Sequence, residues 1–577
     1  MMMMKNNVLD RQNALLIMTG RYGGNNKGIK IMKTKITIIS LFFTINSYCQ
    51  TPSWEWAKSG GGINNDDGTS VVTDASGNVY VTGWFSSPSF LLSTTTLTND
   101  SAGSGDIFVV KYDGLGNVLW AKSFGGISDD YGNGVAIDGN GNVFITGYFH
   151  STTITFGTTT LTRVGGNDVF IVKCDSFGNV IWAKSAGGSA NDESNSIALD
   201  SSGNVLIIGS FNSPSITFGT TTLASAGGND IFIVKYDTGG NVIWAKGEGG
   251  TAYDWGSSVA TDVSGNILIT GYFKSTTIVF GTTTLNNAGI QNTFVAKYNV
   301  SGNALWAKSM EGTTNNGNDI STDNTGNVFV TGSFSAPGII GTDTLTGNGT
   351  VDIFIVKFNA LGSVLWFNGA GSGSLDSGNS IATDANGNIY ETGFYSGYIN
   401  FGATTFTNGG YAEIFVVKYD TFGNVLWAQN VGSANGNSNI GNGITTDGYG
   451  NVFTTGYFLN PTLTFGTINV TNAGNYDMFI AKLNSATGIE ENIQNNEINI
   501  YPNPATNMLQ IASSKFQVEG IKIYNVMGEK VISHWSLVNS NSVTVDVSGL
   551  ENGMYFVEVY FDKLSNGGAV RKKFVKE

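Results

Sequence analysis

The stretch WEWAKSGGG (residues 54–62) decides how this chain folds, because it is half of a motif that the rest of the chain repeats in full. Later copies, of the kind GNVLWAKS or GNVIWAKS, follow a Gly-Asn turn, whereas this first copy has no such turn before it. The last repeat has the opposite defect, since it ends at KLNSATG (residues 482–488) with no Trp behind it. One end of the repeat region therefore holds the half that the other end lacks.

The repeat unit predicts four antiparallel strands. In the second repeat the apolar runs are GVAID (134–138), NVFITGYF (142–149), DVFIVKCD (168–175) and NVIWAKS (179–185). Gly and Asn in the short connections of the first to the second run, and of the third to the fourth, favour two hairpins. The tryptophans that mark the fourth run recur at intervals of 60 to 64 residues: Trp56, Trp120, Trp182, Trp244, Trp306, Trp366 and Trp427.

Seven four-stranded units predict an all-β fold, a seven-bladed β-propeller. The last unit has GITTD (443–447) and two further strands but no fourth. We expect WEWAKSGGG to fill that place and so to close the ring. An open solenoid would carry end caps instead. The composition agrees, with 79 Gly, 12% aromatic and only 12% charged residues, which favours strands separated by turns.

The first 50 residues are interpreted as targeting sequence. We expect Met32 to be the true start and residues 1–31 to be a mis-annotated extension. Lys33 and Lys35 precede an apolar run at 36–45, and Ser47 and Cys49 are small residues before a cleavage site. This layout predicts a signal peptide at 32–50, too short to anchor the mature chain in a bilayer. A lipid anchor on Cys49 is the alternative, although Tyr48 before it is not small.

The repeats resemble the SBBP repeat, the seven-bladed β-propeller repeat of bacterial exported proteins. The matching pattern, which covers residues 53–484, combines GG, D-x-x-G-N-V, T-G-x-F, D-x-F-V-V-K-Y-D and G-N-V-x-W-A-K. Repeats five to seven drift, with FN after Trp366 and AQ after Trp427. The resemblance implies the fold and export. We assign the propeller to residues 51–484.

A polar linker (485–497) precedes about 80 residues of alternating strands and Gly turns, which predict a small β-sandwich at 498–577. This tail resembles the C-terminal type A sorting domain of the type IX secretion system of Bacteroidetes-like bacteria. The resemblance implies the translocon as a partner and a final location in the medium or on the outer cell surface. The matching sorting-signal residues are Pro502, Asn503, Pro504, Gly528, Gly553, Lys572, Lys573, Phe574 and Lys576.

Two repeated residue types are predicted to be structural. An Asp precedes the first turn of every unit: Asp74, Asp138, Asp200, Asp262, Asp323, Asp384 and Asp447. We expect these carboxylates to accept backbone N–H groups of the turn, with metal binding as the alternative. The tryptophans are expected to pack between blades, with carbohydrate stacking as the alternative.

A second set of acids supplies the calcium candidates. The loops that join the fourth to the first strand carry Asp66, Asp130, Asp192, Asp254 and Asp376, with Asn315 and Asn439 at the remaining aligned positions. Oxygen ligands suit calcium, and acids beside Tyr131, Tyr253 and Trp255 suit sugars. Alternatively, the acids stabilise their own Gly-rich loops. We expect no other cofactor.

Charge and residue counts exclude several functions. Residues 51–488 hold 14 basic and 32 acidic residues, and all but Arg163 and Lys274 of the basic ones belong to the repeat. A nucleic-acid partner is therefore excluded. His150 and His534 are the two histidines, in different domains, which argues against a His-dependent triad or a multi-His zinc site.

We therefore expect an exported binding or scaffold propeller without catalytic residues, whose ligand is a glycan or a protein. The alternatives are a polysaccharide hydrolase that uses an Asp/Glu pair on the propeller face, and a purely structural surface protein.

Overall fold

The computed structural model describes residues 52–485, except 102, 288, 348 and 433–435, and residues 498–576, except 503, 514–517, 526–529, 536–541 and 562–568. The predicted N-terminal extension (1–31), the signal peptide (32–50) and most of the linker (485–497) lie outside the described residues.

The second repeat forms one four-stranded antiparallel sheet, as its pattern predicts. Its strands are β8 (Asp130–Ile137), β9 (Val143–Phe149), β12 (Asp168–Cys174) and β13 (Val180–Ala186), in the spatial order β8-β9-β12-β13. Gly141 and Gly178 occupy the two hairpin turns at φ of 79° and 80°, a region that glycine enters without steric cost. The TITFGTTTLT segment forms a separate ribbon of β10 (Thr153–Phe156) and β11 (Thr159–Thr162).

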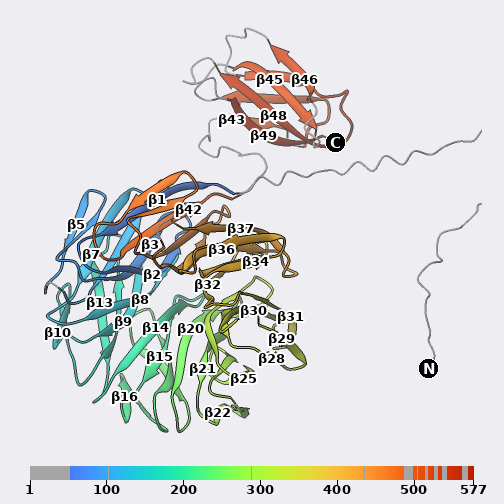
Figure 1. Cartoon of the computed structure of the whole chain (residues 1–577). Helices are drawn as coiled ribbons and strands as arrows, with labels where there is room; N and C mark the ends of the chain where they lie inside the picture. Colours follow the sequence, from blue (N-terminus) through green and yellow to red (C-terminus); the bar gives the residue numbers. More distant parts are fainter. Residues whose placement is uncertain are drawn as a thin grey trace, which may run out of the picture. The chain divides into compact units, whose positions relative to one another are not determined.

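The same arrangement recurs along the chain (Figure 1). The first sheet contains β2 (Asp66–Thr73), β3 (Val79–Phe85), β6 (Asp106–Tyr112) and β7 (Val118–Phe124). The third to sixth contain β14 (Asp192–Leu199), β15 (Val205–Phe211), β18 (Asp230–Tyr236) and β19 (Val242–Glu248); β20 (Asp254–Thr261), β21 (Ile267–Phe273), β24 (Asn292–Tyr298) and β25 (Ala304–Met310); β26 (Asn315–Thr322), β27 (Val328–Phe334), β30 (Asp352–Phe358) and β31 (Val364–Ala370); β32 (Ser377–Thr383), β33 (Ile389–Tyr395), β36 (Glu413–Tyr419) and β37 (Val425–Val431).

Two-stranded ribbons accompany these sheets. They are β16 (Ser215–Phe218) with β17 (Thr221–Ala224), β22 (Thr277–Phe280) with β23 (Thr283–Asn286), β28 (Gly338–Ile340) with β29 (Asp343–Leu345), β34 (Tyr398–Phe401) with β35 (Thr404–Thr407), and β40 (Thr462–Phe465) with β41 (Ile468–Thr471).

The sheet of the seventh repeat takes its fourth strand from the start of the repeat region. It contains β38 (Asn439–Thr446), β39 (Val452–Phe458), β42 (Asp477–Leu483) and β1 (Trp54–Gly61), and β4 (Ser89–Leu92) and β5 (Thr95–Thr98) extend it. β1 pairs antiparallel with β42. Just outside this pairing, the backbone N–H of Ser53 donates to Oδ1 of Asn484 (2.9 Å), and the Asn484 N–H donates to the Ser53 carbonyl (3.0 Å).

Consecutive sheets share apolar cores. One cluster joins Tyr80 and Val109 of the first sheet to Val143, Phe149 and Phe170 of the second, all fully buried. The first strands of neighbouring repeats also lie side by side, β38 beside β2 included. Amide side chains on these strands donate to carbonyls of the next repeat: Asn133 to Ser194 (2.9 Å), Asn195 to Gly256 (2.8 Å), Asn318 to Gly378 (2.8 Å), Asn379 to Gly441 (3.0 Å) and Asn442 to Gly68 (3.3 Å).

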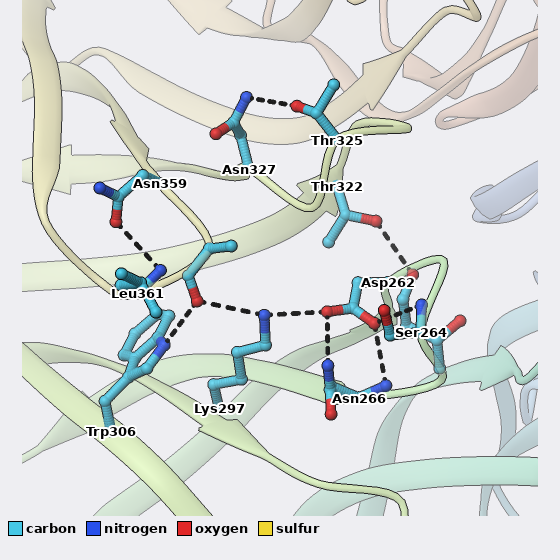
Figure 2. Close-up of polar contacts among 12 residues, drawn as sticks. Asp262, Ser264, Asn266, Lys297, Trp306, Thr322, Thr325, Asn327, Asn359 and Leu361 are labelled. Carbon is cyan, nitrogen blue, oxygen red and sulfur yellow. Dashed lines mark hydrogen bonds and ion pairs between the residues drawn. The ribbon is translucent and has the colours of Figure 1, made fainter.

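The lysine of the third strand and the tryptophan of the fourth strand both bind the neighbouring sheet. Lys297 lies 2.8 Å from Oδ2 of Asp262 in its own sheet and donates to the carbonyl of Ala360 in the next one (3.3 Å). Nε1 of Trp306 donates to the same carbonyl (3.2 Å), as Figure 2 shows. Asp262 also accepts the N–H groups of Ser264 and Asn266 in its turn. Both structural predictions, the turn role of the aspartate and the inter-sheet role of the tryptophan, are confirmed here.

The C-terminal tail forms two sheets of its own. One contains β43 (Ile498–Tyr501), β44 (Met508–Ser513) and β47 (Ser542–Asp546); the other contains β46 (Lys530–Trp535), β45 (Val518–Asn525), β48 (Gly553–Phe561) and β49 (Ala569–Lys576). Leu509 and Ile511 of the first sheet share a buried cluster with Ile523, Val557 and Val559 of the second. Two sheets facing one core are the arrangement of a β-sandwich.

Removal of Lys297 tests the inter-sheet contact. Because Lys297→Ala leaves the Asp262 carboxylate buried beside no cation, we expect the free energy of unfolding to fall by about 3 kcal/mol. Chemical denaturation measures it, with the exposed Lys308 replaced by Ala as the control. Equal losses in the two variants would contradict the role assigned to Lys297.

Truncation tests the role of β1. A chain that starts at Gly62 exposes the edge of β42, so we expect its Tm to fall by roughly 10 °C relative to a chain that starts at Pro52. Differential scanning calorimetry measures both, and unchanged thermal stability would show that β1 is dispensable.

Candidate functional site

The predicted calcium candidates are the first residues of their strands or lie just before them, and none is exposed. Asp130 has 0% of its surface exposed. Its Oδ2 accepts the Ser151 hydroxyl (2.7 Å), and its Oδ1 accepts the N–H groups of His150 (3.0 Å) and Ser151 (3.1 Å). The carboxylate thus joins the loop before β8 to the loop after β9.

The other members of the set repeat this geometry, each with 0% exposure. Asp66 accepts the hydroxyl of Ser87, Asp192 that of Ser213 and Asp254 that of Ser275, each at 2.7 Å. Asp376 accepts the N–H of Ser396 (2.9 Å), and Asn439 accepts the side-chain amide of Asn460 (3.1 Å). A serine 21 residues after Asp66, Asp130, Asp192 and Asp254, and 20 residues after Asp376, is the sequence signal that would have identified these pairs.

This geometry fits loop stabilisation and does not fit calcium. N–H and O–H donors face the carboxylate oxygens, whereas calcium needs six to eight oxygen ligands around one point. Among the residues that the structure describes, no group of three or more His, Cys, Asp or Glu side chains is arranged to hold a metal ion. Burial raises the pKa of Asp66, Asp130 and Asp376 to about 6.

The structure adds acids that the sequence did not single out. Asp106, Asp168, Asp230 and Asp477 start the third strands and are at most 3% exposed. Asp106 accepts the N–H of Asp100 through Oδ2 (2.8 Å), and burial raises its pKa to about 7. A Cβ on Gly125 would overlap this carboxylate, which explains why the repeat places glycine after the tryptophan strand.

A chain of aromatic side chains lies on the loop face, defined here as the end of the sheets where the loops from fourth to first and from second to third strands lie. Its members are Tyr457, Tyr476, Trp84, Tyr131 and Tyr148, and we call them the aromatic arc. Their ring centroids follow one another at 4.6, 6.0, 4.7 and 5.2 Å. All five side chains are partly exposed.

Polar groups flank both ends of the arc. Asp67, beside Tyr457 and Tyr476, accepts the side-chain amide of Asn442 (2.8 Å), and burial raises its pKa to about 7. Near Tyr148, Glu193 accepts the amide of Asn167 (2.6 Å). Oδ1 of Asn167 lies 2.9 Å from Nδ1 of His150.

A second aromatic group lies beyond Glu193. Tyr253, Trp255 and Tyr272 stack with interplanar angles of 5° and 10°, and Nζ of Lys274 lies 5.5 Å from the Tyr253 centroid. Tyr131, Tyr253 and Trp255 are thus the predicted aromatic residues that the structure places on this face. Trp84, Tyr148, Tyr457 and Tyr476 were not predicted.

The fold does not require these rings. In the fifth repeat the positions of Tyr131 and Tyr148 hold Asn316 and Ser333, and in the third they hold Glu193 and Ser210, paired in the same register. Side chains that build the fold recur in every repeat. The position of Tyr148 is also aromatic at Tyr272 and Phe394, but the serines of the third and fifth repeats show that a ring there is not needed for folding. Partly exposed aromatic rings beside a few polar groups are typical of a binding surface.

Asp106→Asn tests the electrostatic cost of the buried third-strand acids. The pKa of Asp106 is about 7 in the folded chain and near 3.8 in the unfolded one, so the folded state binds more protons between these values and the wild type loses stability as pH rises through them. The amide does not titrate, and Asn292 occupies this position in the fourth repeat.

We therefore expect the variant to gain stability over the wild type as pH rises from 4 to 8, with little difference at pH 4. Urea unfolding across this range measures the gain. A difference that does not change with pH would contradict it.

Comparison with known families gives two matches. Residues 499–577 match the secretion system C-terminal sorting domain, and residues 119–148 match the SBBP β-propeller repeat. Pro502, Pro504, Gly553 and Lys576 of the predicted sorting signal are described residues. Asn503 and Gly528 lie outside them, and Lys572, Lys573 and Phe574 are described only as backbone positions of β49.

An uncharacterized WD repeat-containing protein of Acanthamoeba polyphaga mimivirus is 26% identical over 529 residues, which cover 74% of this chain and 38% of that protein. This chain therefore spans less than half the length of that relative. Among solved structures, the Pan2 WD40 domain of Neurospora crassa has a TM-score of 0.37 at 9% identity and covers 72% of this chain and 88% of its own.

PorZ, a surface component of the type IX secretion system of Porphyromonas gingivalis, has a TM-score of 0.25 at 12% identity over 88% of this chain and 74% of its own. No helix in the described part of the chain is long and apolar enough to cross a membrane. The chain contains SBBP β-propeller repeat sequence and ends in a type IX sorting domain, which directs its export to the cell surface or the medium.

Proposed function

We propose that this chain is an exported seven-bladed β-propeller that acts as a binding or scaffold protein and takes its ligand on the loop face. The sorting tail is its contact with the type IX translocon. Closure of the seven sheets into a ring is supported by the pairing of β1 with β42 and by the Asn442 to Gly68 hydrogen bond between the last and first repeats.

The aromatic arc is the observation that carries the binding role. Its five rings come from the seventh, first and second repeats and contact one another in sequence. Because the rings are only partly buried, apolar surface stays in contact with water, and a ligand would cover this surface. A ligand that spans these repeats is either a glycan or a protein.

A polysaccharide hydrolase with an Asp/Glu pair is the weaker alternative. Such a pair needs two carboxyl groups directed at one bond of the substrate. Of the acids beside the arc, Asp67 is 9% exposed and bonded to Asn442, and Glu193 is bonded to Asn167. Both are engaged within the face, so we assign no catalytic residue.

A glycan array and a random peptide library test the binding role. The purified full chain is exposed to a glycan array and to a random peptide library, each with wild type, Trp84→Ala and a control, Tyr398→Ala. Tyr398 is 46% exposed on the β34 ribbon, away from the arc. We expect wild type and control to capture ligand and Trp84→Ala to lose it. Capture that survives Trp84→Ala, or no capture from either library, would favour a purely structural role.

Deletion of the tail tests the route of export. A chain that ends at residue 497 keeps the signal peptide but lacks the sorting domain, so we expect it to remain in the periplasm. Cell fractionation followed by immunoblotting measures the distribution. Normal amounts in the medium or on the outer surface would show that the tail is not the address.

A further inference from the structure

We propose that the aromatic arc binds an uncharged polysaccharide chain. This inference rests on the proposed binding role and narrows its ligand to one chemical class. Three features of the face lead to it: the shape of the apolar surface, the kinds of hydrogen-bonding groups beside it, and the sign of its charge.

The arc offers a run of ring faces and edges instead of one deep pocket. Successive rings are inclined to each other, at 37° for Tyr457 and Tyr476, 89° for Tyr476 and Trp84, and 69° for Trp84 and Tyr131. Sugar rings present C–H groups on their faces and hydroxyls on their edges, so each unit of a chain can pack on one aromatic ring. A run of five rings therefore suits a polymer better than a single sugar.

The polar groups at the arc match the edges of sugar rings. Burial raises the pKa of Tyr131 to about 12 and that of Tyr148 and Tyr476 further above its ordinary value. Phenol groups are protonated at neutral pH and can each donate one hydrogen bond to a ligand. The partly exposed Glu193, which accepts from Asn167 through Oε1, supplies Oε2 as an acceptor beside Tyr148. Hydroxyl groups both donate and accept, so one ligand class satisfies both kinds of group.

The acids of the face disfavour anionic polymers. Asp129 accepts the N–H of Gly105 (2.8 Å), which lies against Trp84 and Tyr131, and Glu193 accepts the amide of Asn167 near Tyr148. Among the described residues, Lys274 lies against Tyr253, and Arg163 donates to the carbonyls of Gly165 and Gly166 just before Asn167. A uronate or sulfated polymer would meet repulsion and unpaired charge.

A peptide is the competing occupant. An extended peptide presents one N–H donor and one carbonyl acceptor per residue, and proline lacks the N–H. A sugar unit carries several hydroxyl groups, each of which donates and accepts. A polysaccharide therefore offers more donors to the carboxyl groups beside the arc than a peptide backbone of the same length.

Matched polysaccharides test the inference. The full chain is titrated with neutral glucans, mannans and xylans, dextran included, and with dextran sulfate and carboxymethylated forms of the same polymers. Isothermal titration calorimetry or affinity electrophoresis gives Kd. The variants are Trp84→Ala, Tyr476→Ala and the conservative Trp84→Phe, with Tyr398→Ala as the control and circular dichroism to verify folding.

We expect at least one neutral polymer to bind and its charged form to bind at least about tenfold more weakly. Each alanine variant of the arc should weaken binding by about tenfold or more, while Trp84→Phe and Tyr398→Ala stay within about twofold of the wild type. Binding of charged polymers alone, or binding that the arc variants leave unchanged, would overturn the inference.

The peptide library separates the two levels of the proposal. Arc-dependent capture of peptides with no binding of any neutral polysaccharide would overturn the polysaccharide inference and leave the binding role intact. Absence of every arc-dependent ligand would overturn both.

Discussion

The structure depends on a lysine that is buried between two sheets. Lys297, 4% exposed, binds a turn aspartate of its own sheet and a turn carbonyl of the next, and the tryptophan of the fourth strand donates to the same carbonyl. Lys235 does the same with Asp200 and Val300. A buried ammonium group is tolerated only where its donors are matched, so this contact fixes how the third and fourth sheets lie against the sheets that follow them.

At the junction of the first and last repeats, the equivalent lysine, Lys482, joins the two ends of the repeat region. Lys482 lies 2.9 Å from Oε2 of Glu55 in β1 and donates to the carbonyl of Gly114 in the first sheet (3.2 Å). Glu55 stands where the other repeats have Leu or Ile. β1, the fourth strand that comes from the N-terminal end of the repeat region, therefore carries a side chain, Glu55, that pairs with the buried lysine.

Recurrence in every repeat distinguishes the residues that build the fold from the residues that the fold does not require. Turn aspartates, inter-sheet lysines and tryptophans recur because every repeat needs them. The loop acids recur for the same reason, since Asp130 and its equivalents join two loops of their own sheet. The aromatic arc recurs only in part. The position of Trp84, Tyr148 and Tyr457 also holds Tyr272 and Phe394, whereas Ser210 and Ser333 at the same position show that the fold does not require a ring there.

The amino-acid sequence by itself determined the strand order, the hairpin turns and the completion of the last sheet by residues 54–61. These follow from spacing, because alternation of apolar residues and the place of Gly-Asn turns are local properties of the chain. It also identified the sorting tail. The sequence did not determine which carboxylates are accessible: Asp66, Asp130 and Asp192 looked like a ligand ring, and burial with serine partners became visible only in the folded chain.

The aromatic arc was decided by the tertiary structure alone. Trp84 and Tyr476 are nearly 400 positions apart in the chain, and their rings meet at 6.0 Å because the last sheet packs beside the first. The periodicity of the sequence depends on residues that are neighbours along one strand. It carries no signal for contacts between single residues of different repeats, because those depend on how whole sheets pack against one another.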